Sequence, residues 1–161
     1  MNGIGLFKKA ISHPVTGLVL RVYIGGIFIA ASMYKINYPG EFAETIASYQ
    51  LVPYWGVNLM ALIMPWTELL CGLMLILGFR TRASAVLIAA MLVVFCVAIT
   101  VTLLRGIPIG CGCFTTVEDP LSWTTLIRDL IWLAMTVQVI LFPSALQLED
   151  RLLMSLKEVD G

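Results

Sequence analysis

Long uncharged apolar stretches, separated by short polar breaks, dominate the sequence. Four of these stretches reach the length of about 20 residues that a helix needs to cross the hydrocarbon core of a bilayer. They cover residues 15–34, 56–79, 83–104 and 121–142. The pattern predicts an all-α fold, in which a four-helix transmembrane bundle forms one integral membrane domain over residues 1–161.

Polar turns predict how the spans are connected. The tripeptide Arg80-Thr81-Arg82 leaves room only for a tight turn, so the second and third spans should form an antiparallel hairpin. Asp119-Pro120 combines an N-cap residue with a proline suited to the first helical position, and it predicts the start of the fourth span. The two longer connections, residues 35–55 and 105–120, should then lie together at the other side of the membrane.

Three shorter segments have an amphipathic pattern. Phe42, Ile46 and Tyr49 share one face of a predicted helix that follows the first span. Residues 4–11 and 144–159 repeat this pattern near the two ends of the chain. All three are expected to be short helices that lie in the membrane interface.

The composition agrees with a membrane protein. Of the 161 residues, 60% are hydrophobic and 12% are charged, and the mean hydropathy is +0.95. Soluble domains carry roughly 25% charged residues. The formal net charge is zero, so no excess of positive charge points to nucleic acid as a partner. The first partner that the composition implies is the lipid bilayer itself.

Basic residues are distributed unequally between the two sides of the predicted bundle. Lys35 and Arg105 fall on the side of the long connections. The opposite side carries Lys8, Lys9, Arg80, Arg82, Arg151 and Lys157. Because cytoplasmic loops are enriched in Lys and Arg, both termini are predicted to be cytoplasmic. In a bacterium this topology means a multi-pass protein of the inner membrane, with residues 105–120 facing the oxidising periplasm.

The predicted periplasmic connection contains the sequence Cys111-Gly112-Cys113. A thiolate attacks disulfides, and a strained, exposed disulfide is readily exchanged, so the pair is a candidate redox site. Gly112 makes the backbone conformations of a small ring accessible. A static disulfide staple and separate disulfides to other chains remain alternatives. A metal site would need more ligands, and His13, the only histidine, is predicted on the other side; no metal is expected.

Four charged residues fall inside the predicted spans: Arg21, Glu68, Arg128 and Asp129. An unpaired charge at mid-bilayer costs at least about 2.5–3.5 kcal/mol, so these side chains should face the bundle interior and pair. Their predicted depths allow Glu68 to pair with either arginine. Such a polar core could be structural, or it could bind a substrate or the headgroup of a quinone. Lys35, at the outer end of the first span, is expected to snorkel towards water.

Two further features lie within the spans. Cys71 and Cys96 fall near the middle of the second and third spans and could be neighbours. Buried cysteine usually behaves as a small inert hydrophobe; the alternative is a second thiol pair that relays electrons inward from Cys111 and Cys113. Pro65 should kink the second span close to Glu68 and free a carbonyl group one turn earlier, which suggests a cavity beside the buried carboxylate.

The order and spacing of several motifs resemble the DoxX/MauE group of four-span membrane proteins. The resemblance covers about residues 17–140 and is carried by Arg21, "KINYPGEFAETIASYQLVP", "MPWTELLCGLMLILGFRTR", "RGIPIGCGCF" and Arg128-Asp129. The "GCGCF" sequence points to the MauE-like branch. Thr115 departs from the glycine that relatives often have after this phenylalanine, which affects the local loop geometry and not the cysteine pair.

The resemblance implies a membrane protein associated with thiol redox chemistry. MauE-type proteins assist the maturation of methylamine dehydrogenase, whose small subunit is rich in disulfides, together with a thioredoxin-like partner. The redox role carries over to Cys111 and Cys113 only. The leading hypothesis is thiol–disulfide exchange with such a partner or a disulfide-containing client, and electrons pass to or from a membrane carrier such as a quinone. The rival hypothesis is a non-enzymatic accessory subunit of a larger respiratory or electron-transfer complex, so whether the chain is an enzyme stays open.

Overall fold

A computed structural model describes residues 14–107, 109–110 and 121–142. The helices in this part of the chain are α2 (Pro14–Asn37), α3 (Pro39–Ser48), α4 (Tyr54–Leu77), α5 (Thr81–Arg105) and α6 (Trp123–Leu141). Four of them, α2, α4, α5 and α6, are long and apolar enough to cross a membrane. The prediction of an all-α protein with four spans is therefore confirmed, with helix ends that differ by at most a few residues.

Some predicted features cannot be compared with this structure. The amphipathic segments 4–11 and 144–159 lie outside the described residues, as does the predicted helix start at Asp119-Pro120. Within the described part, α6 begins at Trp123, and its N-cap residue is Ser122 in an extended conformation. The fourth helix thus starts two residues later than the apolar pattern indicated.

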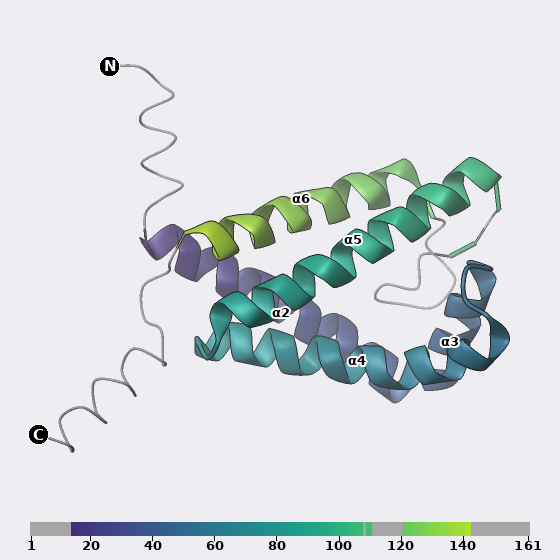
Figure 1. Ribbon diagram of the computed structural model, residues 1–161, viewed down its shortest axis with the longest axis horizontal. Helices are drawn as coiled ribbons and strands as arrows, with labels where there is room; N and C mark the ends of the chain where they lie inside the picture. Colours follow the sequence, from purple (N-terminus) through teal and green to yellow (C-terminus); the bar gives the residue numbers. More distant parts are fainter. Residues whose placement is uncertain (1–13, 108, 111–120, 143–161) are drawn as a thin grey trace, which may run out of the picture.

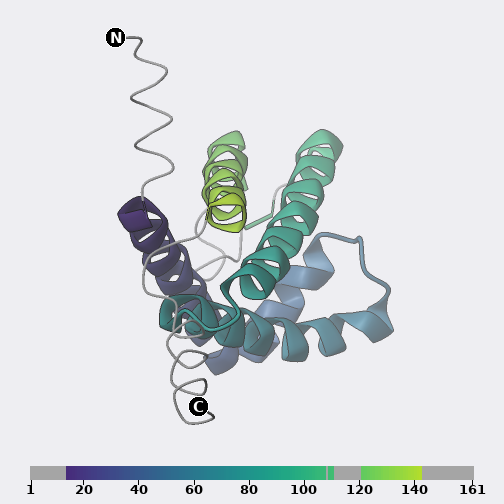
Figure 2. The ribbon, with the colours of Figure 1, turned by 60° about the vertical axis from the view of Figure 1, so that its left-hand side comes forward.

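The four long helices form two packed pairs. α2 packs along α4, α5 packs along α6, and contacts of α4 with α5 and of α2 with α6 join the pairs. Figures 1 and 2 show α4 and α5 diverging from the turn that connects them, towards the side on which α3 lies. We call the side with this turn the hairpin end and the side with α3 the loop end.

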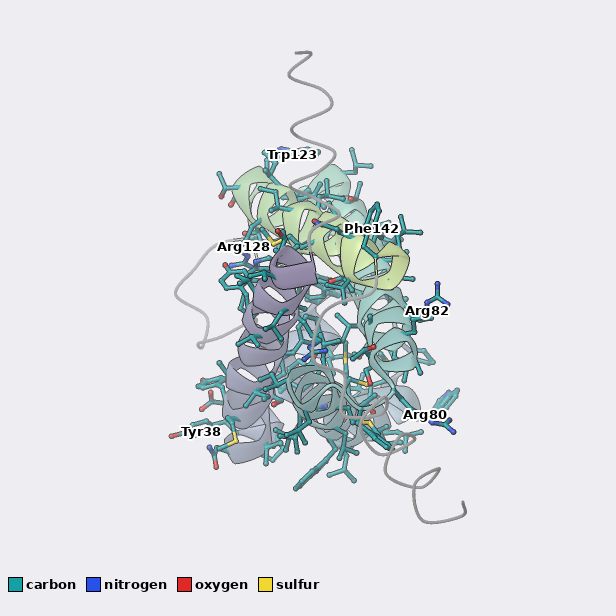
Figure 3. All side chains as sticks on the ribbon, turned by 90° about the vertical axis from the view of Figure 1, so that its left-hand side faces the viewer. Tyr38, Arg80, Arg82, Trp123, Arg128 and Phe142 are labelled. Atoms are coloured by element: carbon teal, nitrogen blue, oxygen red, sulfur yellow. The ribbon has the colours of Figure 1, made fainter. Side chains whose placement is uncertain are left out.

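The turn at the hairpin end is as tight as its sequence predicts. Gly78 ends α4 with φ 77°, in the left-handed region, and its N–H donates to the carbonyl oxygen of Met74 at 3.1 Å. Arg80 is also left-handed, with φ 44°, just before α5 begins. The side chain of Arg80 projects away from the bundle (Figure 3). Arg82 Nε donates to the carbonyl oxygen of Ile140 at 3.3 Å, which ties the start of α5 to the end of α6.

Two glycines allow α2 and α4 to approach closely. A Cβ atom added to Gly25 would lie 2.8 Å from the carbonyl oxygen of Gly72 and 2.6 Å from Cγ1 of Ile76. A Cβ atom on Gly72 would in turn lie 2.9 Å from the carbonyl oxygen of Gly25. Small residues at such crossings let helix backbones pack directly against each other, as is common in membrane bundles.

Two hydrophobic clusters fill the protein interior. The first joins the four long helices and contains Ile24, Phe28, Cys71, Leu75, Ala85, Ile88, Leu92 and Val139. The second lies between α3 and α4 and contains Phe42, Ile46, Val57 and Ala61. The helix predicted from Phe42, Ile46 and Tyr49 is confirmed. Its apolar face, however, packs on protein: α3 folds back onto the first turns of α4, so this face is covered and is not free to lie on lipid.

The outer surface of the bundle is strongly apolar. Large hydrophobic side chains such as Val19, Leu62, Leu70 and Val94 are more than half exposed. A water-soluble protein rarely exposes so much contiguous apolar surface. Together with the four candidate spans, this surface indicates that the bundle sits in a lipid bilayer.

We predict that Gly25→Ala destabilises the protein and that the adjacent Gly26→Ala does not. Nothing lies within 4 Å of a Cβ atom added to Gly26, whereas at Gly25 the added atom would meet backbone of α4. Overpacking typically costs about 1–3 kcal/mol, while Ala at an open helical site gains about 0.5–1 kcal/mol over Gly. Thermal unfolding in detergent should show a lower Tm for Gly25→Ala only. Equal Tm values for the two variants would contradict this close helix contact.

Candidate functional site

A buried ion pair links α2 to α4. Lys35 Nζ donates to both carboxylate oxygens of Glu68, each at 2.8 Å. The side chains are only 9% and 6% exposed. The sequence predicted that Glu68 is buried and paired, and this is confirmed. The predicted partners, Arg21 or Arg128, were wrong for this ion pair, which is made by Lys35.

The side chain of Lys35 turns inward because α3 lies between it and the water at the loop end. α3 begins at Pro39, shortly after Lys35, and folds back so that the ring of Phe42 lies 5.0 Å from Lys35 Nζ. The expected snorkelling of Lys35 is therefore wrong. The ammonium group lies between the face of an aromatic ring and the Glu68 carboxylate.

A second charged pair belongs to α6. Asp129 is 1% exposed, and its Oδ1 accepts a hydrogen bond from Arg128 Nε at 3.1 Å. Asp129 Oδ2 is buried and has no hydrogen-bond partner among the described residues. Arg128 is partly exposed, and its guanidinium lies 4.7 Å from the centre of the Trp132 ring. The sequence placed both residues in a polar core; Asp129 lies deep inside it and Arg128 at its edge.

Arg21 is buried as predicted. Because residues seven apart lie on nearly the same face of a helix, Arg21 and Lys35 both face the interior from α2, with Phe28 between them. The inward face of this helix thus carries two basic residues.

The ion pairs line a cavity of about 270 Å³. Lys35, Glu68, Arg128 and Asp129 contribute its charged groups, and most of the remaining wall is apolar. The cavity lies where the two helix pairs diverge, and α3 closes part of it. The suggestion from Pro65 that a cavity lies beside Glu68 is confirmed. Ligand sites in proteins commonly combine a mainly apolar wall with a few convergent polar groups.

Tyr49 was not among the predicted site residues, yet it lines this cavity. Its side chain is buried, and its ring centre lies 6.2 Å from that of Phe95. Burial raises the pKa of the Tyr49 phenol, and the negative charge of Asp129 adds to this effect. The signal available in the sequence was the apolar face that Tyr49, the C-cap residue of α3, shares with Phe42 and Ile46, but that face was expected to lie in the membrane interface.

Cys111 and Cys113 lie outside the described residues, but the base of their segment is described. The N–H of Leu121 donates to the carbonyl oxygen of Ile109 at 2.9 Å, so the chain leaves and re-enters the bundle at one point of the loop end. Cys71 and Cys96 are buried and free, as expected for inert cysteines. Among the described residues, no group of three or more His, Cys, Asp or Glu side chains could hold a metal ion.

Comparison with known proteins adds family information. The family model described as "Methylamine utilisation protein MauE" matches residues 13–142. The chain is similar to methylamine utilization protein MauE of Paracoccus denitrificans, with 29% identity over 79% of this chain and 69% of the relative. It is also similar to the MauE protein of Methylorubrum extorquens, with 29% identity over 77% of this chain and 68% of the relative. No solved structure gives a significant match.

We predict strong coupling between Lys35 and Glu68 in a double-mutant cycle. Lys35→Met or Glu68→Met leaves one buried charge without its partner, and each should lower the free energy of unfolding by about 3–5 kcal/mol. The double variant removes both charges and should recover most of this loss. The measurement is denaturant-induced unfolding in mixed micelles.

The exposed Glu44 of α3 provides the control for this cycle. Glu44→Gln should change stability by less than about 0.5 kcal/mol. Additive effects of Lys35→Met and Glu68→Met would contradict a buried ion pair that joins α2 to α4.

Proposed function

The chain belongs to the MauE family of methylamine utilisation proteins, and from this premise we propose that it is an integral membrane component of thiol–disulfide exchange. Its active groups would be Cys111 and Cys113. Its partner would be a periplasmic thioredoxin-like protein or a disulfide-containing client. The observation that carries the proposal is a Cys-Gly-Cys pair in a short segment that leaves and re-enters the bundle at one point.

The proposed exchange is a pair of thiolate displacements. The thiolate of one loop cysteine attacks a disulfide of the partner, forms a mixed disulfide and releases one partner thiolate. The second loop cysteine then attacks its neighbour's sulfur in the mixed disulfide and releases the other partner thiolate. The loop ends as the Cys111–Cys113 disulfide and the partner as a dithiol; the reverse sequence of steps oxidises the partner.

The hydrogen bond between Leu121 and Ile109 supports this role for the loop. It brings the two ends of the cysteine segment together at the surface of the bundle. A segment held at both ends has less conformational freedom to lose when it forms a small ring or docks a partner. The rest of the bundle would serve as the membrane anchor that presents the loop.

Charge asymmetry supports a periplasmic position for the loop. Arg80 and Arg82 lie exposed at the hairpin end (Figure 3). At the loop end, Lys35 is neutralised by Glu68 and buried, which leaves Arg105 as the basic residue of the adjoining helix end. We therefore assign the hairpin end to the cytoplasm of a bacterial cell.

The client class follows from the family. Relatives carry the name methylamine utilization protein, and we propose a maturation role for disulfide-rich periplasmic proteins, with methylamine dehydrogenase-type clients among them. The extended hydrophobic surface of the bundle would also allow contacts with other membrane subunits.

We predict that single cysteine variants trap the partner. In Cys111→Ser or Cys113→Ser cells, one of the two variants should accumulate a mixed disulfide, because the second displacement cannot occur. Non-reducing gel electrophoresis followed by mass spectrometry of the band would identify the partner.

The variants Cys71→Ala and Cys96→Ala are the matched controls, because both of these cysteines are buried in the bundle. They should trap nothing and should leave client maturation intact. If neither loop variant traps a partner and both support full client maturation, the loop pair is structural and the accessory-subunit hypothesis takes precedence.

We also predict that a membrane-impermeant maleimide labels the reduced loop from outside the cell. In spheroplasts of a Cys71→Ala/Cys96→Ala strain treated with a mild reductant, Cys111 and Cys113 should react without membrane permeabilisation. A cysteine introduced in place of Arg80 should react only after permeabilisation. The opposite pattern would reverse the assigned orientation.

A further inference from the structure

We propose that the cavity lined by Lys35, Glu68, Arg128 and Asp129 binds the ring of a lipid-soluble quinone or its quinol. The site is built from described residues alone and is separate from the two loop cysteines. Electron transfer between the bound quinone and the loop cysteines rests on the function proposed above, whereas quinone binding itself does not.

The cavity reaches the lipid-facing surface of the bundle. Val94 and Val97 line it, yet they are 60% and 57% exposed. Both lie near the middle of α5, which runs from Thr81 to Arg105, and therefore near the middle of the bilayer. A ligand would enter sideways from the hydrocarbon core, so it must dissolve in lipid.

The charged groups of the cavity favour a neutral headgroup. Lys35 is matched by Glu68, and Arg128 is matched by Asp129. The four charges sum to zero, and each cation already has a carboxylate partner, so the cavity offers no net attraction for a phosphate or a carboxylate. A phospholipid headgroup or a fatty acid therefore fits poorly at this position, whereas an uncharged ring with polar substituents fits.

Asp129 supplies an unused hydrogen-bonding position. Its Oδ2 is buried without a hydrogen-bond partner among the described residues, and leaving such an atom unsatisfied is unfavourable. A carboxylate accepts a hydrogen bond, whereas a protonated carboxyl group can donate one. The hydroxyl groups of a quinol are donors and the carbonyl groups of a quinone are acceptors, so Asp129 can hydrogen-bond both forms.

The apolar wall suits a flat ring. Phe28, Phe42, Tyr49, Phe95 and Trp132 contribute aromatic rings to it, and Met60, Met64 and Met91 contribute flexible, polarisable side chains. Aromatic faces stack well on planar rings, and methionine adapts to irregular ligand shapes. This combination distinguishes the cavity from a simple groove for an acyl chain.

The redox chemistry balances if this site works with the loop. When the reduced Cys111–Cys113 pair forms a disulfide, it loses two electrons and two protons, and a quinone takes up both to become a quinol. Asp129 lies six residues into α6, about 9 Å along the helix axis from Trp123, close to where the loop re-enters the bundle. Oxidation of quinol by the loop disulfide is the reverse reaction.

The test measures binding of decylubiquinone to the full-length protein in detergent by quenching of tryptophan fluorescence. Val97→Phe should narrow the opening of the cavity towards the lipid and weaken decylubiquinone binding about tenfold or more. Val86→Phe is the matched control, since Val86 is 51% exposed on the same helix and does not line the cavity. Asp129→Asn should also weaken binding about tenfold, the loss expected for a hydrogen bond to a charged group.

Saturable binding that is weakened by Val97→Phe and not by Val86→Phe supports the proposal. Absence of saturable binding, or equal effects of the two phenylalanine variants, overturns it. A phospholipid that stays bound in native mass spectrometry and is not displaced by decylubiquinone also overturns it. These valine variants keep the test decisive even if Asp129→Asn does not fold.

The same measurement on Cys111→Ser/Cys113→Ser separates the two proposals. Quinone binding should be unchanged in this double variant. If quinone binds but no partner is trapped by the single cysteine variants, the thiol-exchange function fails and the quinone site stands. If a partner is trapped but quinone does not bind saturably, the quinone site fails and the function stands.

Discussion

The buried ion pair between Lys35 and Glu68 is the interaction on which the loop end of this protein depends. Isolated charges are unfavourable in a bilayer, and here each one meets its partner at 2.8 Å inside the bundle. The pair joins α2 to α4 on the loop-end side of the point where Gly25 and Gly72 bring the two backbones together. α3 completes the arrangement, because it places the ring of Phe42 over the ammonium group and separates Lys35 from water.

The cavity follows from this arrangement. α4 and α5 are held together at the hairpin end by a short turn, and they diverge towards the loop end (Figure 1). The hydrophobic cluster of Leu75, Ala85 and Ile88 fills the narrow part. Beyond it the space widens, and charged side chains from α2, α4 and α6 line it together with aromatic residues of α3 and α5. A buried polar layer beside a cavity is a common arrangement for intramembrane ligand sites, because ionisable groups within a bilayer are seldom present without a role.

The two proposals assign thiol exchange and quinone binding to two neighbouring sites at the loop end of the bundle. The cysteine segment would exchange disulfides with a protein partner in water. The cavity would exchange electrons with a lipid-soluble carrier inside the bilayer. Ile109 and Leu121 mark where the loop leaves and re-enters the bundle, and Asp129 lies six residues into α6, which begins just after Leu121. A membrane protein that connects aqueous thiols to a membrane electron pool needs these two sites near each other, and the topology of the chain places them at the same end.

The sequence by itself determined the class of the protein, its four spans, the tight hairpin and the burial of Arg21, Glu68 and Asp129. These properties depend on the length of apolar runs, on turn residues and on the cost of a charge in lipid, all of which are local. Only the tertiary structure decided that Lys35 pairs with Glu68, that Arg128 pairs with its neighbour Asp129, and that Tyr49 belongs to the cavity. The depth of a charged residue in the membrane, read along each helix separately, does not identify its partner, because pairing depends on how the helices cross.

The decisive element was α3. Its amphipathic pattern predicted a helix correctly, but a pattern cannot say whether an apolar face meets lipid or protein. Once α3 packs on α4, Lys35 can no longer reach water, and it turns to the carboxylate of Glu68.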